Sequence, residues 1–116
     1  PNYVIAINNR GVAKLEKGDY KEAVDDFTLV IQKDPEYQFA YNNRGIAKYK
    51  IEDYQSALED FNKAIELDNN YAIAYLNRGN TKEMLQDIEG ACTDWTKASE
   101  LGIKQSNMYL KQLCNK

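Results

Sequence analysis

Apolar residues recur along the chain at helical spacing, in segments that are separated by short polar breaks. Ile5, Val12 and Leu15 lie on one side of the first segment, which ends at the break Lys17-Gly18-Asp19. A second periodic segment follows and ends at Asp34-Pro35. Two amphipathic helices joined by a tight break form a helical hairpin. The same pattern along the chain predicts helices at about 3–16, 20–33, 38–50, 54–67, 72–85 and 88–101.

The sequence also repeats itself with a period of 34 residues. The tetrapeptide NNRG stands at 8–11 and at 42–45, and it returns as LNRG at 76–79. Residues 4–37 and 38–71 are identical at 15 aligned positions, and residues 72–105 match the second copy at 13. We therefore expect three copies of one helical hairpin and a capping helix at about 105–115, which form a single all-α domain over residues 1–116.

This period and its residue pattern resemble the tetratricopeptide repeat family, whose consensus reads W-x2-L-G-x2-Y, then A-x3-F, then P. Gly11, Gly45 and Gly79 stand at the small-residue position, and Ala23 with Phe27 matches the second half. The resemblance implies a right-handed α-solenoid of three tetratricopeptide hairpins plus a C-terminal capping helix. The Asn-Arg-Gly triplet resembles a bacterial variant of the family.

The repeated glycine has a packing role in this interpretation. Two helices approach to about 8 Å only where the side chains at the contact are small. We expect Gly11 to face Ala23 across the first hairpin, and we expect Phe27, Phe61 and Trp95 to fill the space between neighbouring hairpins.

The repeated arginine departs from the family consensus, which has leucine there. An aspartate follows sixteen residues later in every copy, giving the pairs Arg10/Asp26, Arg44/Asp60 and Arg78/Asp94. An offset of that size brings the two residues onto facing helices. We expect a ladder of half-buried ion pairs that specifies how the hairpins dock. Three independent surface charges are the alternative.

The first helix of each hairpin lines the concave face in proteins similar to this family. Asn9, Asn43 and Asn77 lie on that helix, and each side-chain amide can offer one donor and one acceptor to the backbone of an extended peptide. A solvated polar face is the alternative. The other residues that we expect to bind a peptide are Asn8, Asn42, Phe39, Tyr49, Ile46, Ile73 and Asn80.

Some tetratricopeptide domains bind the C-terminal carboxylate of chaperones through lysine and asparagine on their first helices. The positions that should be basic hold Asn8, Ile73 and Asn77 in this chain, and only Asn43 fits the pattern. A receptor for chaperone tails is therefore disfavoured. A segment of another protein remains the expected partner.

A second hypothesis is a structural or self-assembly unit that stacks end to end with other copies or with further repeats. Pro1-Asn2-Tyr3 aligns with residues 35–37 and 69–71, which close the repeats before the next helix begins. We therefore expect a fragment of a longer array. Its N-terminal end should be uncapped and partly apolar, which would allow a homo-oligomer.

Composition excludes several other functions. With 15 basic and 18 acidic residues the net charge is -3, so the chain lacks the concentrated positive surface that binds nucleic acid. It contains no histidine, which excludes imidazole catalysis, and two cysteines alone form no zinc site. No apolar run approaches the roughly 20 residues that cross a bilayer. We predict a protein that is not an enzyme, needs no cofactor and does not insert into a membrane.

Cys92 and Cys114 are expected to lie near one another. Antiparallel helices joined at Gly102 bring the two to similar heights, and Cys92 occupies the interior position of Val24 and Leu58. Either two buried thiols or a disulfide fits these positions. A disulfide would imply an oxidising compartment, and the stretch GACTDWTKASELG resembles the ends of exported bacterial repeat proteins. The bacterial periplasm or the cell exterior is therefore favoured over the cytoplasm.

Overall fold

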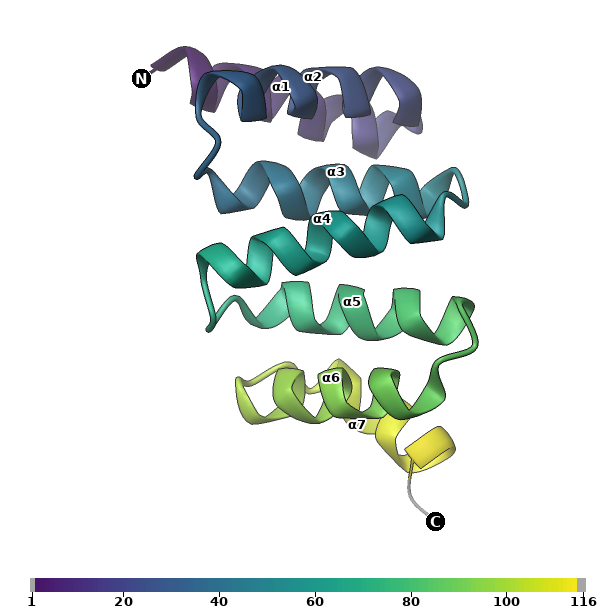
Figure 1. Cartoon of the computed structure of the whole chain (residues 1–116). Helices are drawn as coiled ribbons and strands as arrows, with labels where there is room; N and C mark the ends of the chain where they lie inside the picture. The colour runs from purple at the N-terminus through teal and green to yellow at the C-terminus, as the bar shows by residue number, and fades with distance from the viewer. Residues whose placement is uncertain (1, 115–116) are drawn as a thin grey trace.

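The computed structural model describes residues 2–114 and, within them, consists of helices and short connections (Figure 1). These elements pack sequentially into three stacked hairpins followed by a short C-terminal helix, which confirms the predicted all-α fold. The helices are α1 (Asn2–Lys17), α2 (Tyr20–Lys33), α3 (Gln38–Lys50), α4 (Tyr54–Leu67), α5 (Ala72–Met84), α6 (Ile88–Glu100) and α7 (Gln105–Tyr109), and a π-helical stretch (Leu110–Cys114) continues α7.

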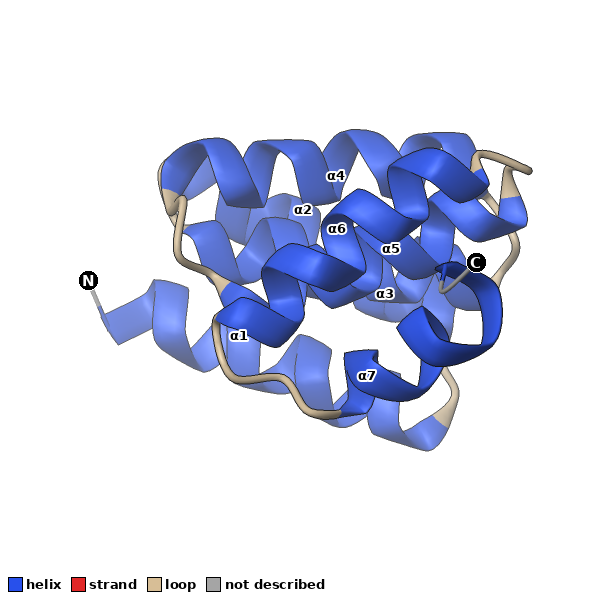
Figure 2. Cartoon of the chain, turned by 90° about the horizontal axis from the view of Figure 1, so that it is seen from below, coloured by secondary structure: helices blue, strands red, loops and turns tan. Residues whose placement is uncertain are grey.

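The stack is elongated, with extents of 47 × 25 × 20 Å. Its first helices α1, α3 and α5 lie on one side, and its second helices α2, α4 and α6 lie on the other (Figure 2). Helices α2 and α4 each pack both on their own hairpin partner and on the first helix of the next hairpin, and α6 packs on α5 and on α7. The middle hairpin, α3 and α4, is therefore covered on two sides.

The capping segment differs in detail from the sequence prediction. It lies against α6 as expected, but the α-helix gives way to a π-helical stretch at Leu110. The predicted end at residue 115, like the prediction for Pro1, falls outside the described residues.

The turn between the two helices of each hairpin has the same backbone form in every copy. Gly18, Glu52 and Gln86 occupy equivalent positions, and all three have positive φ, at 88°, 68° and 69°. The following aspartate N–H then donates to a carbonyl in the last turn of the first helix, as Asp53 does to Lys48 at 2.9 Å. The polar breaks in the sequence are thus left-handed helix ends, a conformation that favours glycine.

The repeated glycine faces an aromatic ring. A Cβ added at Gly11 would lie 2.6 Å from Cε1 of Phe27, and one at Gly45 would lie 2.6 Å from the same atom of Phe61. Sequence reasoning named Ala23 as the contact of Gly11 and did not name the ring, whose atoms are the nearest. At Gly79 the carbonyl oxygen of Ala91, the equivalent of Ala23, also lies 3.2 Å from an added Cβ. Both phenylalanines and Trp95 are buried. Phe27 belongs to one core cluster with Ala47 of the next hairpin, so this ring contributes to the packing between hairpins as expected.

Candidate functional site

The side of the stack formed by α1, α3 and α5, called the inner face below, carries an apolar row at the beginning of its helices. Ile5, Phe39 and Ile73 occupy equivalent positions, and their exposed fractions are 53%, 44% and 36%. The Phe39 ring lies edge-on to the rings of Tyr37 and Tyr71, with centroids 5.4 and 5.6 Å away. Two predicted site residues, Phe39 and Ile73, thus lie in this accessible row.

A row of side-chain amides follows about one helical turn further along. Asn43 donates from Nδ2 to Oδ1 of Asn8 at 3.2 Å, and Asn77 donates in the same way to Asn42 at 3.1 Å. Asn8 and Asn42 are buried, whereas Asn9 is exposed. The predicted asparagines are therefore not equivalent, because two pairs of them join neighbouring hairpins. In each pair the amide nitrogen of the donor, Asn43 or Asn77, carries a second N–H.

The buried member Asn42 also borders Tyr71. Burial raises the pKa of Tyr71 to about 12, and a hydrogen bond with Asn42 acts in the opposite direction. The phenol is therefore neutral at physiological pH and contributes a hydroxyl to this part of the inner face.

A pocket of about 240 Å³ lies beyond the amide row, between α3 and α5. It is lined by Ile46, Tyr49, Lys50, Phe61, Asn77 and Asn80. Four of these, namely Ile46, Tyr49, Asn77 and Asn80, are residues that the sequence predicted for peptide binding. The structure brings them together around one cavity.

Two of the pocket side chains are held in place by neighbouring groups. Asn80 accepts a hydrogen bond at Oδ1 from Nε1 of Trp95 at 3.0 Å, which fixes the orientation of the amide. Tyr49 lies edge-on to Tyr54, with ring centroids 5.2 Å apart, and its pKa is raised chiefly by burial. The pocket therefore presents an oriented amide and a neutral phenol rather than mobile groups.

Beneath the inner face, the predicted arginine–aspartate pairs are present in all three hairpins. Arg44 donates from Nε and Nη2 to the two carboxylate oxygens of Asp60, at 2.9 and 2.8 Å. The equivalent pairs Arg10/Asp26 and Arg78/Asp94 have the same two-bond geometry. The aspartates are buried, which excludes the alternative of independent surface charges.

Each of these aspartates also binds a lysine, which sequence reasoning missed. Nζ of Lys48 lies 3.1 Å from Asp60, and Lys14 and Lys82 contact Asp26 and Asp94 at 3.1 and 3.0 Å. These lysines stand where the family consensus has tyrosine. The arginine and the lysine that depart from the consensus therefore belong to one arrangement, because both bind the same buried carboxylate.

The arginine also reaches the preceding hairpin. Nη1 of Arg44 donates to Oγ1 of Thr28 at 3.1 Å, and Nη1 of Arg78 donates to Oδ1 of Asn62 at 3.1 Å. Thr28 and Asn62 each lie sixteen residues before the arginine that they bind. This constant spacing could have revealed the contacts from the sequence alone. The contacts specify how one hairpin docks on the next.

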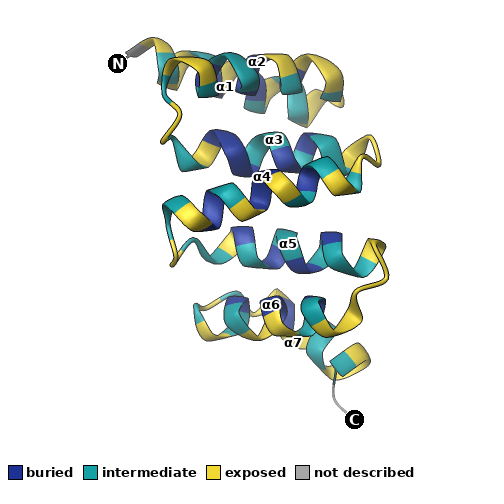
Figure 3. Ribbon diagram, viewed as in Figure 1, coloured by how far each residue is buried: buried dark blue, intermediate teal, exposed yellow. Residues whose placement is uncertain are grey.

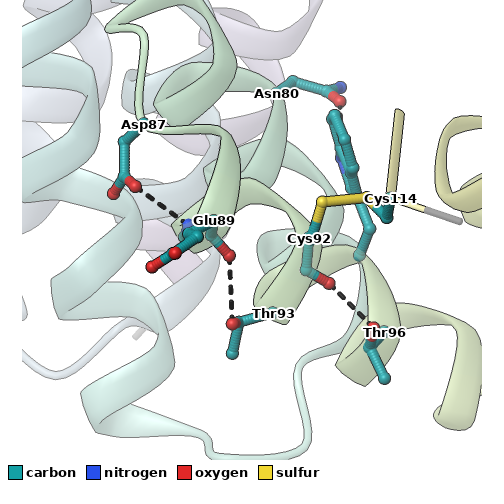
Figure 4. Close-up of a disulfide and its surroundings, with 9 residues drawn as sticks. Asn80, Asp87, Glu89, Cys92, Thr93, Thr96 and Cys114 are labelled. Atoms are coloured by element: carbon teal, nitrogen blue, oxygen red, sulfur yellow. Dashed lines mark hydrogen bonds between the residues drawn. A yellow bond between two sulfur atoms is a disulfide. The ribbon is translucent and has the colours of Figure 1, made fainter. Parts of the chain in front are cut away.

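The C-terminal end of the stack is closed by a disulfide. Cys92 on α6 is bonded to Cys114, with Cα atoms 5.8 Å apart (Figure 4). Thr96, one turn further along α6, donates to the carbonyl of Cys92. Tyr109 stacks against Trp95 with ring centroids 5.0 Å apart. The capping segment is thus attached to α6 by a covalent bond and an aromatic contact.

Residues 5–37 and 39–71 each match a model described as tetratricopeptide repeat, and together these segments cover more than half of the chain. The chain belongs to the tetratricopeptide repeat family. Members of this family are protein-binding modules, and the chain is a non-catalytic module of this kind. Among curated proteins, no sequence gives a significant match.

Several solved tetratricopeptide domains are similar to the whole chain. The second domain of human RPAP3, solved with the HSP70 peptide SGPTIEEVD, is 30% identical with a TM-score of 0.90, covering 97% of this chain and 96% of that one. The TPR2B domain of yeast Sti1, solved as a pHsp70 complex, is 26% identical with a TM-score of 0.87 and coverages of 97% and 94%. The Arabidopsis OM64 domain is 27% identical with a TM-score of 0.92 and coverages of 95% and 93%.

Within residues 2–114, no helix is both long and apolar enough to span a bilayer. The same residues contain no group of three or more potential metal ligands from histidine, cysteine, aspartate and glutamate.

Proposed function

We propose that the inner face binds an extended, largely uncharged segment of another protein, with one apolar side chain of that segment in the pocket beside Tyr49. The observation that supports this proposal most directly is the pocket, because its walls combine Ile46 and two aromatic rings with the amides of Asn77 and Asn80. Ligand sites commonly combine an apolar lining with a few oriented polar groups.

The amide row suits a peptide backbone. Asn43 and Asn77 are partly exposed, and their bonds to Asn8 and Asn42 hold them in one orientation. The second N–H of each asparagine can donate to a backbone carbonyl of the bound segment. The side chains of that segment then contact the apolar row of Ile5, Phe39 and Ile73. Rigid groups lose little conformational entropy on binding, which favours affinity.

An acidic C-terminal tail is disfavoured as the ligand. The RPAP3 and Sti1 domains were solved with HSP70-type peptides, and the family resemblance implies basic side chains for a terminal carboxylate. This chain holds Asn8, Ile73 and Asn77 at those positions. Lys50, at the rim of the pocket, offers a single exposed cation, too little to compensate for desolvating several carboxylates.

A binding experiment can test the proposal. A library of displayed peptides selects binders, and SGPTIEEVD serves as the acidic probe. We expect the selected peptides to be uncharged in their core and to bind at least tenfold more tightly than SGPTIEEVD. Chemical-shift changes should lie on α1, α3 and α5. Tighter binding of SGPTIEEVD, or shifts confined to α2, α4 and α6, would contradict the proposal.

Two alanine variants on the inner face and one control variant elsewhere make the test specific. Tyr49→Ala removes a wall of the pocket, and Phe39→Ala removes the centre of the apolar row. Ile88→Ala removes an exposed apolar side chain at the start of α6, away from the inner face, with an exposed fraction of 38% against 44% for Phe39. We expect both inner-face variants to weaken binding of a selected peptide at least fivefold and Ile88→Ala to leave it unchanged.

We further propose that the protein acts in an oxidising compartment, the bacterial periplasm or the cell exterior, as a member of the bacterial NRG-type variant of the family. The disulfide supports the compartment, and the repeated Asn-Arg-Gly triplet supports the subgroup. Thiol counting on unreduced, denatured protein from the native source should find fewer than one free thiol per chain. Two free thiols would contradict the compartment.

A further inference from the structure

The capping segment, residues 105–114, is held on the stack by few groups. It packs mainly on α6, and its two helical stretches, Gln105–Tyr109 and Leu110–Cys114, have five residues each. Ser106 is the one buried residue of the segment, and the others are half-buried or exposed (Figure 3). Helices this short are not stable without tertiary contacts. The position of the segment therefore depends on individual contacts with α6.

One buried group opposes the docked position of the segment. The N–H of Ser106 donates to the carbonyl three residues earlier, as the N–H groups of Ala40 and Ala74 do in the first turns of α3 and α5. Serine thus stands where the other two helices have a buried alanine. Within residues 2–114 its hydroxyl has no hydrogen-bond partner. An unpaired buried hydroxyl destabilises the state that buries it, so docking carries an unfavourable contribution.

The docked segment is held on α6 by the disulfide, by stacking of Tyr109 on Trp95 and by a hydrogen bond from Ser99 to Asn107. The hydrogen bond is exposed, so water can replace it. The disulfide acts differently, because it restricts the states that are open to the undocked chain. It therefore shifts the segment toward the docked position.

Tyr109 connects the docked segment to the pocket on the inner face. Its ring stacks on Trp95 with centroids 5.0 Å apart, and Nε1 of Trp95 donates to Oδ1 of Asn80 at 3.0 Å. Asn80 lines the pocket and lies in the surroundings of the disulfide (Figure 4). A short series of contacts thus leads from the capping segment to an amide of the pocket.

Tyr49 supplies a second link between the segment and the pocket. Burial is the largest cause of its raised pKa, and charges on Tyr54, Glu83 and Tyr109 add to the effect. Tyr109 is therefore close enough to interact electrostatically with Tyr49. Two pocket residues, Asn80 and Tyr49, thus depend on where the capping segment places one ring.

A thiol can reach the disulfide through a second hollow, of about 340 Å³. It is lined by Thr96, Asn107, Leu110, Lys111 and Cys114. It shares no lining residue with the inner-face pocket, so a reagent that enters it does not compete with a bound peptide. Lys111 brings a positive charge to the hollow, and a positive charge favours the thiolate form of a nearby sulfur.

We propose that the bond between Cys92 and Cys114 is a redox switch for the inner-face pocket. The oxidised chain keeps the capping segment docked and Asn80 oriented, whereas reduction by a dithiol releases the segment and weakens peptide binding. This inference rests on the function proposed for the inner face.

The reduction is a pair of thiol–disulfide exchanges. A thiolate of the dithiol attacks Sγ of Cys114, and the sulfur of Cys92 leaves and takes up a proton. The second thiolate of the reagent then displaces Cys114, which takes up the other proton. Both protons and both electrons come from the reagent, which ends as a disulfide while the chain ends with two thiols.

The first test needs no peptide. NMR measures hydrogen exchange of Nε1–H of Trp95, the single tryptophan, before and after reduction with dithiothreitol. We expect exchange to accelerate at least tenfold, because undocking opens the contact with Asn80, while the backbone amide of Phe61 in α4 exchanges as before. Unchanged exchange at Trp95 would overturn the proposal. Equal acceleration at Phe61 would also overturn it, since the whole stack would then be opening.

The second test measures binding of the tightest uncharged peptide that the displayed library yields with the oxidised chain. We expect reduction to weaken its binding at least fivefold, which corresponds to a docked population below about one fifth. The variant with Cys92→Ser and Cys114→Ser should bind as weakly as the reduced chain and should not respond to dithiothreitol. Tight inner-face binding that reduction leaves unchanged would overturn the switch and leave the proposed function standing. Failure to obtain any inner-face peptide would contradict the function, while exchange at Trp95 still decides whether the segment controls the pocket.

Variants of the capping segment test the role of the Tyr109 ring with the disulfide intact. Tyr109→Ala should weaken binding of the same peptide at least threefold, and Tyr109→Phe should keep it, because the phenylalanine ring can still stack on Trp95. Met108→Ala is the matched control, since the neighbouring Met108 side chain is 54% exposed, and it should leave binding unchanged. Equal effects of Tyr109→Ala and Met108→Ala would overturn the proposal.

Ser106→Ala tests docking without relying on a loss of function. Introduced into the cysteine-free variant, it removes the unpaired buried hydroxyl and restores the alanine found in α3 and α5. We expect it to raise peptide affinity at least threefold and to slow exchange at Trp95. Absence of both changes would overturn the proposal, because docking would then not control the pocket.

Discussion

Arg44 and Thr28 join the first hairpin to the second. Nη1 of Arg44 donates to the Thr28 hydroxyl at 3.1 Å while the other two arms of the guanidinium hold Asp60. A planar group with donors on three sides can bind two partners at once, which an ammonium group cannot do with the same geometry. Arg44 thus connects two hairpins although its main partner, Asp60, lies in the same hairpin as Arg44 itself.

This arrangement predicts unequal effects of replacing the two partners. Arg44→Leu restores the consensus residue and should change the free energy of unfolding by less than about 1.5 kcal/mol, because an apolar side chain recovers packing where the ion pair was. Asp60→Ala should cost about 3 kcal/mol, since it leaves Arg44 and Lys48 partly buried without their carboxylate. Urea unfolding measures both values, and equal small losses would contradict the shared-carboxylate interpretation.

Gly45→Ala should destabilise the domain by about 2 kcal/mol, because the added Cβ would lie 2.6 Å from Cε1 of the fully buried Phe61. Alanine is otherwise the better helix former by roughly 1 kcal/mol. In a Phe61→Leu background the ring is absent, and the same glycine change should be neutral or stabilising. A loss of the same size in both backgrounds would show that the ring is not the cause.

Glu52→Gly and Gln86→Gly should each stabilise the domain by about 0.5 to 1 kcal/mol, because both residues hold a left-handed conformation that glycine adopts without strain. Gly18→Ala, at the equivalent position in the first hairpin, serves as the reverse control and should destabilise by about 1 kcal/mol. Thermal unfolding gives the three values, and a destabilising glycine would contradict this account of the turn.

Reduction of the disulfide should loosen the capping segment and destabilise the domain by about 3 kcal/mol, given a sequence separation of 22 residues. Trp95 is the single tryptophan and lies against Tyr109, so its fluorescence should change before the hairpins unfold. Cys92→Ser with Cys114→Ser should show the same change without reductant and no further response to it. Unchanged fluorescence on reduction would contradict this prediction, because it would mean that the contact between Trp95 and Tyr109 keeps the capping segment in place without the disulfide.

Acid should weaken the first hairpin through Asp26. The hydrogen bond from Arg10, more than any other contact, lowers the pKa of Asp26 below its ordinary value. Because the folded pKa is the lower one, this stabilisation is present above the ordinary aspartate pKa of about 3.9 and is lost as pH falls through the folded value. The stability difference between the native protein and Asp26→Asn should therefore shrink below about pH 4. A constant difference in urea unfolding would contradict the assignment.

The sequence predicted the hairpins and the arginine–aspartate pairs because both recur at a fixed offset in every copy. For Gly11 it predicted a close contact between the two helices but not that the Phe27 ring supplies the nearest atoms, since spacing locates a residue on a helix face but does not show how far a ring reaches. The change to a π-helix at Leu110 had no counterpart elsewhere in the chain, so repetition could not reveal it.

At the candidate site, periodicity placed the residues on the right helices but not their hydrogen bonds. Asn9, Asn43 and Asn77 look equivalent in sequence, yet Asn43 bonds to Asn8 and Asn77 to Asn42 of the hairpin before. Asn9 is exposed. The pocket depends on the amide of Asn80, which replaces an aliphatic residue at Val12 and Ile46 and is oriented by Trp95. Such differences between copies are invisible to an argument from repetition.

The backward and forward contacts of the repeated arginine constrain how this protein can change in length over evolution. The first and second hairpins carry an acceptor for the arginine of the next hairpin, and the second and third carry the arginine that binds it. Insertion or loss of a whole 34-residue unit leaves each remaining joint with a matching partner, whereas a deletion of any other size within the stack would put a hydroxyl or an amide out of register with its guanidinium. A complete repeat of 34 residues is therefore the unit that can be added or removed without leaving a mismatched joint.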